Sequence, residues 1–327
     1  MSTAVKITRI LAPTDFSAAA EAACGLAARL AMRAEAGLVV FHALSGVEMA
    51  QKMGPKLERT QVSILNDVRD RLQEWFEAAV PAELRRFLEV EFNVKVGEPT
   101  PAIAGATKRS GVDLVVMATE GRTGLAHLLL GSVAAAVLRT VSVPVLALRA
   151  GQADRPLATV RRVLWATDFS PASEGAWPYA VMLADLFAAE VLLVHVVRPA
   201  ELAGIADAPV PPSPHWMGRY LEPLEHELER RQQEVEALGL RASRKVLMGP
   251  PAEIIVEEAG KEQADLIVMG THGRTGLGHI LVGSVAEAVI RKAPCPVLAV
   301  RVRREGDAQR KDVGETSTPA EAPSDAD

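Results

Sequence analysis

Short apolar runs alternate with amphipathic stretches along the first half of the chain. Runs rich in Val, Leu, Ile and Ala predict five buried strands, at residues 7–15, 37–43, 88–96, 113–119 and 143–149. Helical spacing of apolar residues predicts helices between them, at 18–36, 101–110, 132–140 and in a longer stretch with Leu65, Val68, Leu72, Trp75 and Ala79. Strands that alternate with helices predict a parallel sheet with right-handed crossovers and helices on both faces.

The second half of the chain repeats the first. Residues 118–149 align without gaps to residues 270–301, at a spacing of 152, and most positions are identical. The string Thr-Asp-Phe-Ser occurs at residues 14–17 and again at 167–170, at a spacing of 153. A repeat of this length predicts two copies of one domain in the same order. We place the copies at residues 1–150 and 158–303.

The same alternation of elements returns in the second copy. Apolar runs predict strands at 161–168, 190–197, 240–248, 265–270 and 296–301, and helices are expected to begin at Ser170, to run through Leu238, and to cover 252–261 and 284–291. Ser170 followed by Pro171 is typical of a helix start, because the hydroxyl caps free N–H groups and proline fits the first position. Residues 304–327 are polar and are expected to form a disordered tail.

Composition and charge exclude several function classes. The chain has 327 residues, 49% of them hydrophobic and 4% aromatic, so two cores can be built mainly from aliphatic side chains. A net charge of −5 and the lack of a basic run argue against nucleic-acid binding. The two cysteines form no CxxC pair, and we find neither a signal peptide nor an apolar run long enough for a membrane span. These features predict a soluble cytoplasmic protein.

Unusual residues gather where the first and fourth strands end. Strand one ends in Pro13-Thr14-Asp15 in one copy and in Ala166-Thr167-Asp168 in the other. Strand four runs into a glycine-rich loop, which ends in Gly-Ser at the start of a helix. In an open parallel sheet, ligands bind beyond the carboxyl ends of strands where the strand order reverses. Free N–H groups and the positive dipole end of a helix favour a phosphate there.

These motifs resemble the nucleotide-binding signature of the universal stress protein family. The resemblance rests on three motifs: G-x-x-G followed by nine residues and G-S, the opening PTDFS, and the closing PVLAVR. The resemblance covers both halves and implies two Rossmann-like (flavodoxin-like) α/β domains, each a five-stranded parallel sheet in the order 3-2-1-4-5. It also implies that the ligand is ATP, with or without Mg²⁺, as in the ATP-binding branch of the family.

The resemblance assigns roles residue by residue. In the second copy Asp168 approaches the nucleoside, and Ala166 and Thr167 precede it among the cofactor-binding residues. The backbone at Val196 meets the adenine, and Met269 and Gly270 line the ribose. The phosphates are held by Gly273, Gly283 and Ser284. Arg274 on the loop adds a cation, and Val285 is included with the cofactor-binding residues. The matching residues of the first copy are Pro13, Thr14, Asp15, Ala43, Met117, Ala118, Gly121, Arg122, Gly131, Ser132 and Val133. Ala118 departs from the family pattern, which has glycine there, so the first site is expected to be the less secure one.

Other chemistries have less support in the sequence. No Walker-type phosphate loop occurs, and no group of Cys and His residues has metal-ligand spacing. We interpret His42, His195, His127 and His279 as structural or pocket-wall residues, and we assign no catalytic residue. The apolar fifth strands are expected to pair within one chain. Further assembly of the chain into a homodimer is left as an alternative.

The leading functional hypothesis is an ATP-binding regulator of the stress response that acts through nucleotide-dependent assembly or partner binding. A nucleotide-free interaction scaffold and a slow nucleotide hydrolase are the alternatives.

Overall fold

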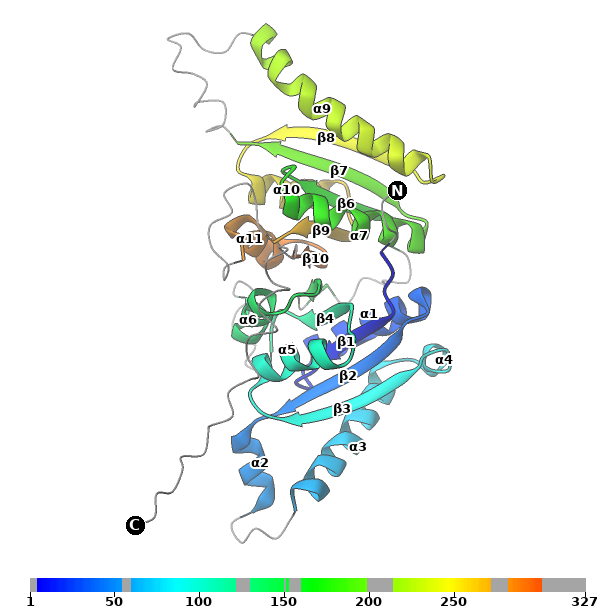
Figure 1. Cartoon of the computed structure of the whole chain (residues 1–327), viewed down its shortest axis with the longest axis vertical. Helices are drawn as coiled ribbons and strands as arrows, with labels where there is room; N and C mark the ends of the chain where they lie inside the picture. The colour runs from blue at the N-terminus through cyan, green and yellow to red at the C-terminus, as the bar shows by residue number, and fades with distance from the viewer. Residues whose placement is uncertain are drawn as a thin grey trace, which may run out of the picture.

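One ten-stranded sheet runs through both halves of the protein (Figure 1). The computed structural model describes residues 5–54, 60–121, 130–149, 151–152, 160–198, 214–271 and 282–301. The first half contributes β1 (Arg9–Pro13), β2 (Gly37–Leu44), β3 (Val90–Val96), β4 (Leu114–Ala118) and β5 (Val145–Leu148). The second half contributes β6 (Arg162–Thr167), β7 (Glu190–Val197), β8 (Ala242–Met248), β9 (Leu266–Gly270) and β10 (Val297–Val300).

The strand order of the sheet is β3-β2-β1-β4-β5-β10-β9-β6-β7-β8. Neighbouring strands are parallel within each half, whereas β5 and β10 pair antiparallel, with Leu146 opposite Leu298. The prediction that the fifth strands pair within the chain is therefore confirmed. Each fifth strand covers the backbone edge of the other, so this pairing joins the two five-stranded sheets into one.

Helices cover both faces of the sheet, as predicted. The first half has α1 (Ala18–Ala34), α2 (Gly46–Met53), α3 (Gln61–Ala79), α4 (Ala82–Arg85), α5 (Pro99–Arg109) and α6 (Ser132–Thr140). The second half has α7 (Pro171–Phe187), α9 (Pro214–Glu236), α10 (Pro251–Lys261) and α11 (Ser284–Lys292). None of the helices in the described part of the chain is long and apolar enough to cross a membrane.

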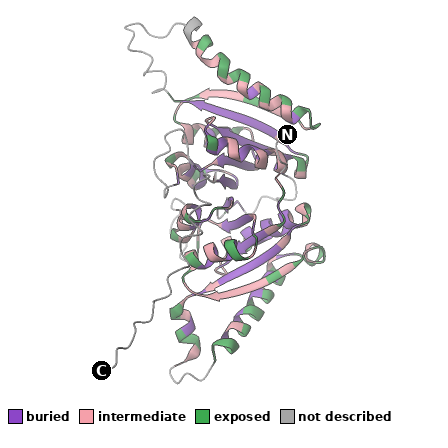
Figure 2. Ribbon diagram, in the orientation of Figure 1, coloured by how far each residue is buried: buried purple, intermediate pink, exposed green. Residues whose placement is uncertain are grey.

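Each face of the sheet has its own apolar core. Buried residues of α1, α3, α7 and α9 pack on one face, and those of α5, α6, α10 and α11 pack on the other. The central strands are buried almost throughout, whereas the outer strands β3 and β8 are only partly buried (Figure 2). Strands covered on both faces need continuous apolar sequence, which is why their pattern does not alternate.

Two short helices and one helix face differ from the predictions. α2 begins with a capping box, in which Ser45 and Glu48 bond each other's backbone, and neither α2 nor the single turn α4 was predicted. The buried face of the predicted long helix, α3, is Ile64, Val68, Leu72 and Phe76. Trp75, predicted to lie on this face, is only partly buried, because Phe76 occupies the fourth position of the stripe.

Candidate functional site

The chain turns sharply where β1 ends, and the turn holds Asp15 in place. The backbone N–H of Thr14 donates to the Phe41 carbonyl at 2.8 Å, and the Thr14 Oγ1 accepts from the Phe16 N–H at 2.9 Å. Asp15 Oδ1 accepts from the Ser17 N–H at 3.0 Å. Phe16 has a φ of 65°, a left-handed conformation that costs a non-glycine residue about 1 kcal/mol or more. Such strain is typical of a functional site.

The turn at the end of β6 repeats this geometry. Thr167 Oγ1 accepts from the Phe169 N–H at 3.0 Å, and Asp168 Oδ1 accepts from the Ser170 N–H at 3.0 Å. Phe169 has a φ of 58°. The recurrence of the same strained turn in both halves indicates that Asp15 and Asp168 are held in the same way.

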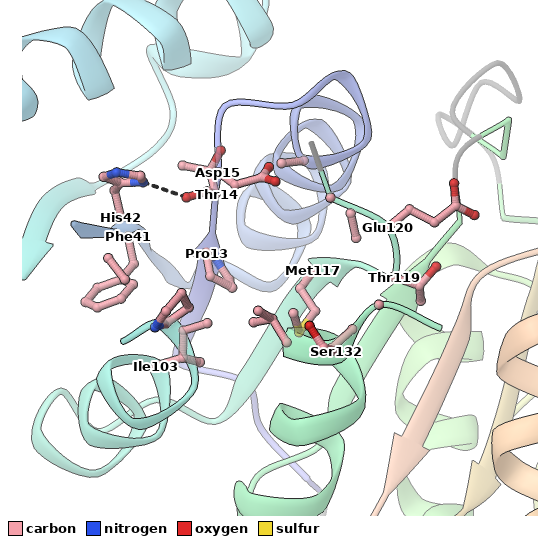
Figure 3. Close-up of a pocket in the computed structure, with 18 of the residues that line it drawn as sticks. Pro13, Thr14, Asp15, Phe41, His42, Ile103, Met117, Thr119, Glu120 and Ser132 are labelled. Atoms are coloured by element: carbon pink, nitrogen blue, oxygen red, sulfur yellow. Dashed lines mark hydrogen bonds between the residues drawn. The ribbon is translucent and has the colours of Figure 1, made fainter. Parts of the chain in front are cut away.

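Two histidines support these turns from β2 and β7. The Nδ1 of His42 lies 2.8 Å from the Thr14 carbonyl oxygen, and the Nδ1 of His195 lies 2.8 Å from the Thr167 carbonyl oxygen (Figure 3 shows the first pair). Because a carbonyl only accepts, each Nδ1 carries the proton. Both rings are buried, in agreement with the structural or pocket-wall role predicted for His42 and His195. The other two predicted histidines, His127 and His279, lie outside the described residues.

The glycine-rich loop of each half is closed at its base by a backbone hydrogen bond. The N–H of Gly131 donates to the Thr119 carbonyl at 2.8 Å, and the N–H of Gly283 donates to the Thr271 carbonyl at 2.6 Å. A Cβ at position 131 would lie 2.8 Å from the Thr119 oxygen, so only glycine fits there. The amides of Gly131 and Gly283 therefore close the loop base.

The free amides lie one residue further on, at the start of the helix. Gly131 is the N-cap of α6 and Gly283 is the N-cap of α11, and no side chain in the described part of the chain caps either helix. The amides of Ser132, Val133 and Ala134 occupy the first three positions of α6, where a helix offers no internal acceptor. Together with the helix dipole, they make a ready site for an anion.

In the first half, the strand-end turn and the helix start line one cavity of about 340 Å³ (Figure 3). All the predicted first-half site residues that the structure describes line it: Pro13, Thr14, Asp15, Ala43, Met117, Ala118, Gly121, Gly131, Ser132 and Val133. Figure 3 shows Asp15 at the end of β1 and Ser132 at the start of α6 on different sides of this space.

A smaller cavity of about 150 Å³ occupies the same place in the second half. Its walls include every described residue predicted for that site: Ala166, Thr167, Asp168, Val196, Met269, Gly270, Gly283, Ser284 and Val285. The predicted residues Arg122, Gly273 and Arg274 lie outside the described part of the chain. The two strand-end carboxylates therefore each share a cavity with an uncapped helix start.

Several lining residues were missed by the sequence reasoning. They come from α5 and α10, from the end of β2 and from the start of α2: Phe41, Ser45, Glu48, Pro99, Ile103, Pro251 and Ile255. Two signals could have found them. The Ser45-x-x-Glu48 capping box follows the second strand, and Pro99 and Ile103 recur as Pro251 and Ile255 at the repeat spacing of 152.

Comparison with known sequences decides the family. The sequence profile of the Universal stress protein family matches residues 6–149 and, a second time, residues 159–301. This chain belongs to the universal stress protein family. Universal stress protein MJ0531 of Methanocaldococcus jannaschii is 40% identical over 142 residues, which cover 43% of this chain and 82% of that protein. A universal stress protein of Mycolicibacterium smegmatis is 29% identical over 304 residues and matches both halves, with 90% of this chain and 97% of the relative covered.

A solved structure shares the fold over both halves. The crystal structure of a universal stress protein from Archaeoglobus fulgidus covers 90% of this chain and 98% of its own, with a TM-score of 0.64 and 20% identity. At this identity the likeness concerns the fold alone. Two universal stress protein domains in one chain, built on one mostly parallel sheet, are thus shown.

Within this universal stress protein, one position explains a difference between the two sites. A Cβ at Gly270 would lie 2.5 Å from the backbone carbon of Ala172, at the start of α7. Ala118, at the matching place in the first half, packs its methyl group with the apolar cluster on the α1 face of the sheet. Position 270 therefore needs glycine because a helix approaches closely, and position 118 accepts a methyl group that points toward α1.

Two further chemistries find no support in the described residues. No group of three or more His, Cys, Asp or Glu residues there is arranged to hold a metal ion. Burial raises the pKa of the Cys24 thiol to about 12, so this residue stays a thiol at neutral pH. Cys24 lies in α1 and packs within the apolar cluster on that face of the sheet.

Proposed function

We propose that this protein binds an adenine nucleotide, ATP with or without Mg²⁺, in the cavity of each half. It then acts as a cytoplasmic regulator of the stress response, through nucleotide-dependent assembly or partner binding and not through rapid catalysis. One observation carries the proposal: each half brings a fixed strand-end carboxylate and an uncapped helix start to the same cavity.

The chemistry of the cavity suits the parts of a nucleotide. The side chains of Phe41, Ile103 and Met117 give the first cavity an apolar wall, which favours a flat base. Asp15 accepts hydrogen bonds and favours a nucleoside, and the amides of Ser132 and Val133 favour phosphate oxygens. The assigned order is adenine at the backbone of Ala43 and Val196, ribose at Met117–Ala118 and Met269–Gly270, and phosphates at the loop and helix start.

A single-amide deletion tests the phosphate cradle. Ser132→Pro removes one N–H at the first position of α6, where proline is well tolerated and the N–H has no partner within the helix. Gly131, with φ −58° and ψ 146°, already has the extended backbone that a following proline requires. Gly131→Val is a poorer test, because it would break the closed loop base.

We expect Ser132→Pro to weaken ATP binding at the first site by about tenfold or more, as for one lost hydrogen bond to a charged group. Adenosine, which lacks phosphates, should bind Ser132→Pro and the wild type with the same affinity in isothermal titration calorimetry. Ser132→Ala keeps the amide and is the matched control, and Ser284→Pro with Ser284→Ala repeats the test in the second half. Equal ATP affinities in Ser132→Pro and the wild type would contradict the cradle.

Purified protein offers an independent check on the ligand. Denaturation of the purified protein is expected to release ATP or AMP, which mass spectrometry then detects. If no nucleotide is released and ATP does not bind in calorimetry, the proposal fails and an interaction scaffold becomes the better description.

A further inference from the structure

The end of β10 in the second half reaches the phosphate-side helix of the first half. Arg301 follows β10 directly, and its Nη1 donates to the Arg139 carbonyl at 2.5 Å. Arg139 lies in the last turn of α6, where backbone carbonyls have no partner within the helix. A cation at this end also favours the helix dipole. A residue of one half thus fixes a helix of the other.

A matching contact runs in the opposite direction. The Ala293 carbonyl, at the C-cap of α11, accepts from Gln152 Nε2 at 2.9 Å and from Arg149 Nη1 at 3.4 Å. Gln152 is buried, and its Oε1 accepts from the Arg149 N–H at 2.9 Å. Both residues follow β5 of the first half. Figure 1 shows α6 and α11 on either side of the junction between the halves.

α6 is held at both of its ends. It has nine residues and is therefore about 13 Å long. The Gly131 N–H bond to the Thr119 carbonyl fixes its amino end, and Arg301 fixes its carboxyl end. A helix of two and a half turns moves as a rigid rod, so a shift at Arg139 also shifts the amides of Ser132 and Val133. The direction of these amides decides how well they meet a phosphate.

The same strand end also holds the loop of its own half. The Val300 carbonyl accepts from the Thr271 N–H at 2.9 Å, and in the first half the Leu148 carbonyl accepts from the Thr119 N–H at 2.8 Å. The last residues of β10 therefore contact Thr271 at the base of the second glycine-rich loop and, through Arg301, the phosphate-side helix of the first site.

We propose that Arg301 is a positioning residue for the first nucleotide site, and that Gln152 with Arg149 does the same for the second. Each site is then completed by the opposite half of the chain. The inference rests on the proposed function, since it concerns how the phosphate-binding amides are aimed. The adenosine part of the ligand does not depend on it, because Asp15 and the end of β2 belong to the first half alone.

The test separates the two sites within the full chain. Hydrogen–deuterium exchange is followed by mass spectrometry during an ATP titration, with peptides of α6 reporting the first site and peptides of α11 reporting the second. In Arg301→Gln we expect that about three to ten times more ATP is needed to protect α6. This change is smaller than that for the loss of one hydrogen bond to a charged group, because Arg301 only positions the amides that make such bonds. The ATP concentration that protects α11, and the affinity for adenosine in calorimetry, should stay as in the wild type.

Two variants serve as controls. Arg301→Lys keeps a cation at the end of α6 and is expected to recover part of the ATP affinity. Arg33→Gln removes another contact between the halves, in which Arg33 Nη1 donates to the Leu186 carbonyl at 3.3 Å, between the ends of α1 and α7. It should leave both ATP titrations unchanged, because it touches neither phosphate-side helix.

The outcomes distinguish this inference from the proposed function. The inference is overturned if α6 is protected at the same ATP concentration in Arg301→Gln and in the wild type. It is also overturned if Arg33→Gln gives the same shift, or if adenosine affinity falls in parallel, since either would indicate a general loosening of the halves. If ATP protects neither helix of the wild type, the proposed function is overturned, and this inference with it.

Discussion

The two halves of the protein share the backbone geometry of the site but differ in the side chains around it. Both have the strained turn with its threonine and aspartate hydrogen bonds, the buried histidine on the threonine carbonyl, and the closed loop base. Their cavities nevertheless differ, at about 340 Å³ and about 150 Å³. At two lining positions the second half has the larger side chain, Ser173 for Ala20 and Val196 for Ala43.

This difference teaches which features of the site are architectural. Hydrogen bonds that set the direction of the backbone recur in both halves, so they place Asp15 and Asp168 in equivalent positions. Side chains that fill the space around the turn have diverged. The departure at Ala118 made the first site the less secure of the two predicted sites. The larger cavity lies in the first half, and the methyl group of Ala118 packs toward α1.

The largest expected effect is at position 270. Gly270→Ala adds a Cβ that would overlap the backbone at the start of α7, so we expect a loss of about 2–4 kcal/mol in the free energy of unfolding. The reciprocal change, Ala118→Gly, creates no clash and should cost only about 1 kcal/mol. Urea denaturation of both variants measures the contrast. Similar losses at the two positions would mean that the approach of α7 does not explain the glycine.

A smaller effect is expected at the two histidines, and there the halves should agree. His42→Phe and His195→Phe each leave a buried threonine carbonyl without its donor, which costs about 1–3 kcal/mol. His42→Asn keeps an N–H donor and should lose less, and His226→Phe, on the exposed surface of α9, is the control. The measurement is again the free energy of unfolding in urea. If the losses in free energy of unfolding differ greatly between His42→Phe and His195→Phe, the two turns are not equivalent.

The smallest effect depends on pH and belongs to the second half. Burial would raise the pKa of Glu190, but hydrogen bonds from Arg162 and Ser243 outweigh it and hold this pKa below its usual range. Because the folded-state pKa is lowered, the stabilisation is present above the unfolded pKa of about 4.3 and is lost as the pH falls through the folded value.

Glu190→Gln should therefore cost about 1 kcal/mol or less at pH 7 and progressively less below pH 4, as followed by urea denaturation at several pH values. The first half has Gly37 at the matching position, and its Arg9 pairs with the exposed Glu91. Glu91→Gln is accordingly the control and should change little at any pH. A cost of Glu190→Gln that does not vary with pH would show that the ion pair is not its source.

Most of the elements could be predicted because their signals are local. Apolar runs, the Ser170-Pro171 start and the Gly-Ser helix starts depend on neighbours in the sequence, and they predicted α6 and β7 with the bounds that the structure has. α2 has an equally local signal in its capping box. α4 is a single turn without a side-chain cap, so it left no comparable pattern.

The candidate site was predictable in its members and not in its bonding. The repeat placed Asp15 and Ser132 near each other, because parallel strands end at the same edge of the sheet. It did not indicate that the Gly131 amide closes the loop on Thr119, since that bond depends on where the loop returns. Nor did it indicate that Arg301 ends on the Arg139 carbonyl, which requires the antiparallel pairing of β5 with β10.

By itself the sequence determined the alternation of strands and helices, the duplication and the residues at the strand ends, because these follow from hydrophobic period and local backbone preference. The tertiary structure decided that the joining strands β5 and β10 run antiparallel, which amides stay available at the helix starts and which half holds each helix end. Those outcomes depend on contacts between residues far apart in the chain, such as Arg139 and Arg301, and no local pattern records them.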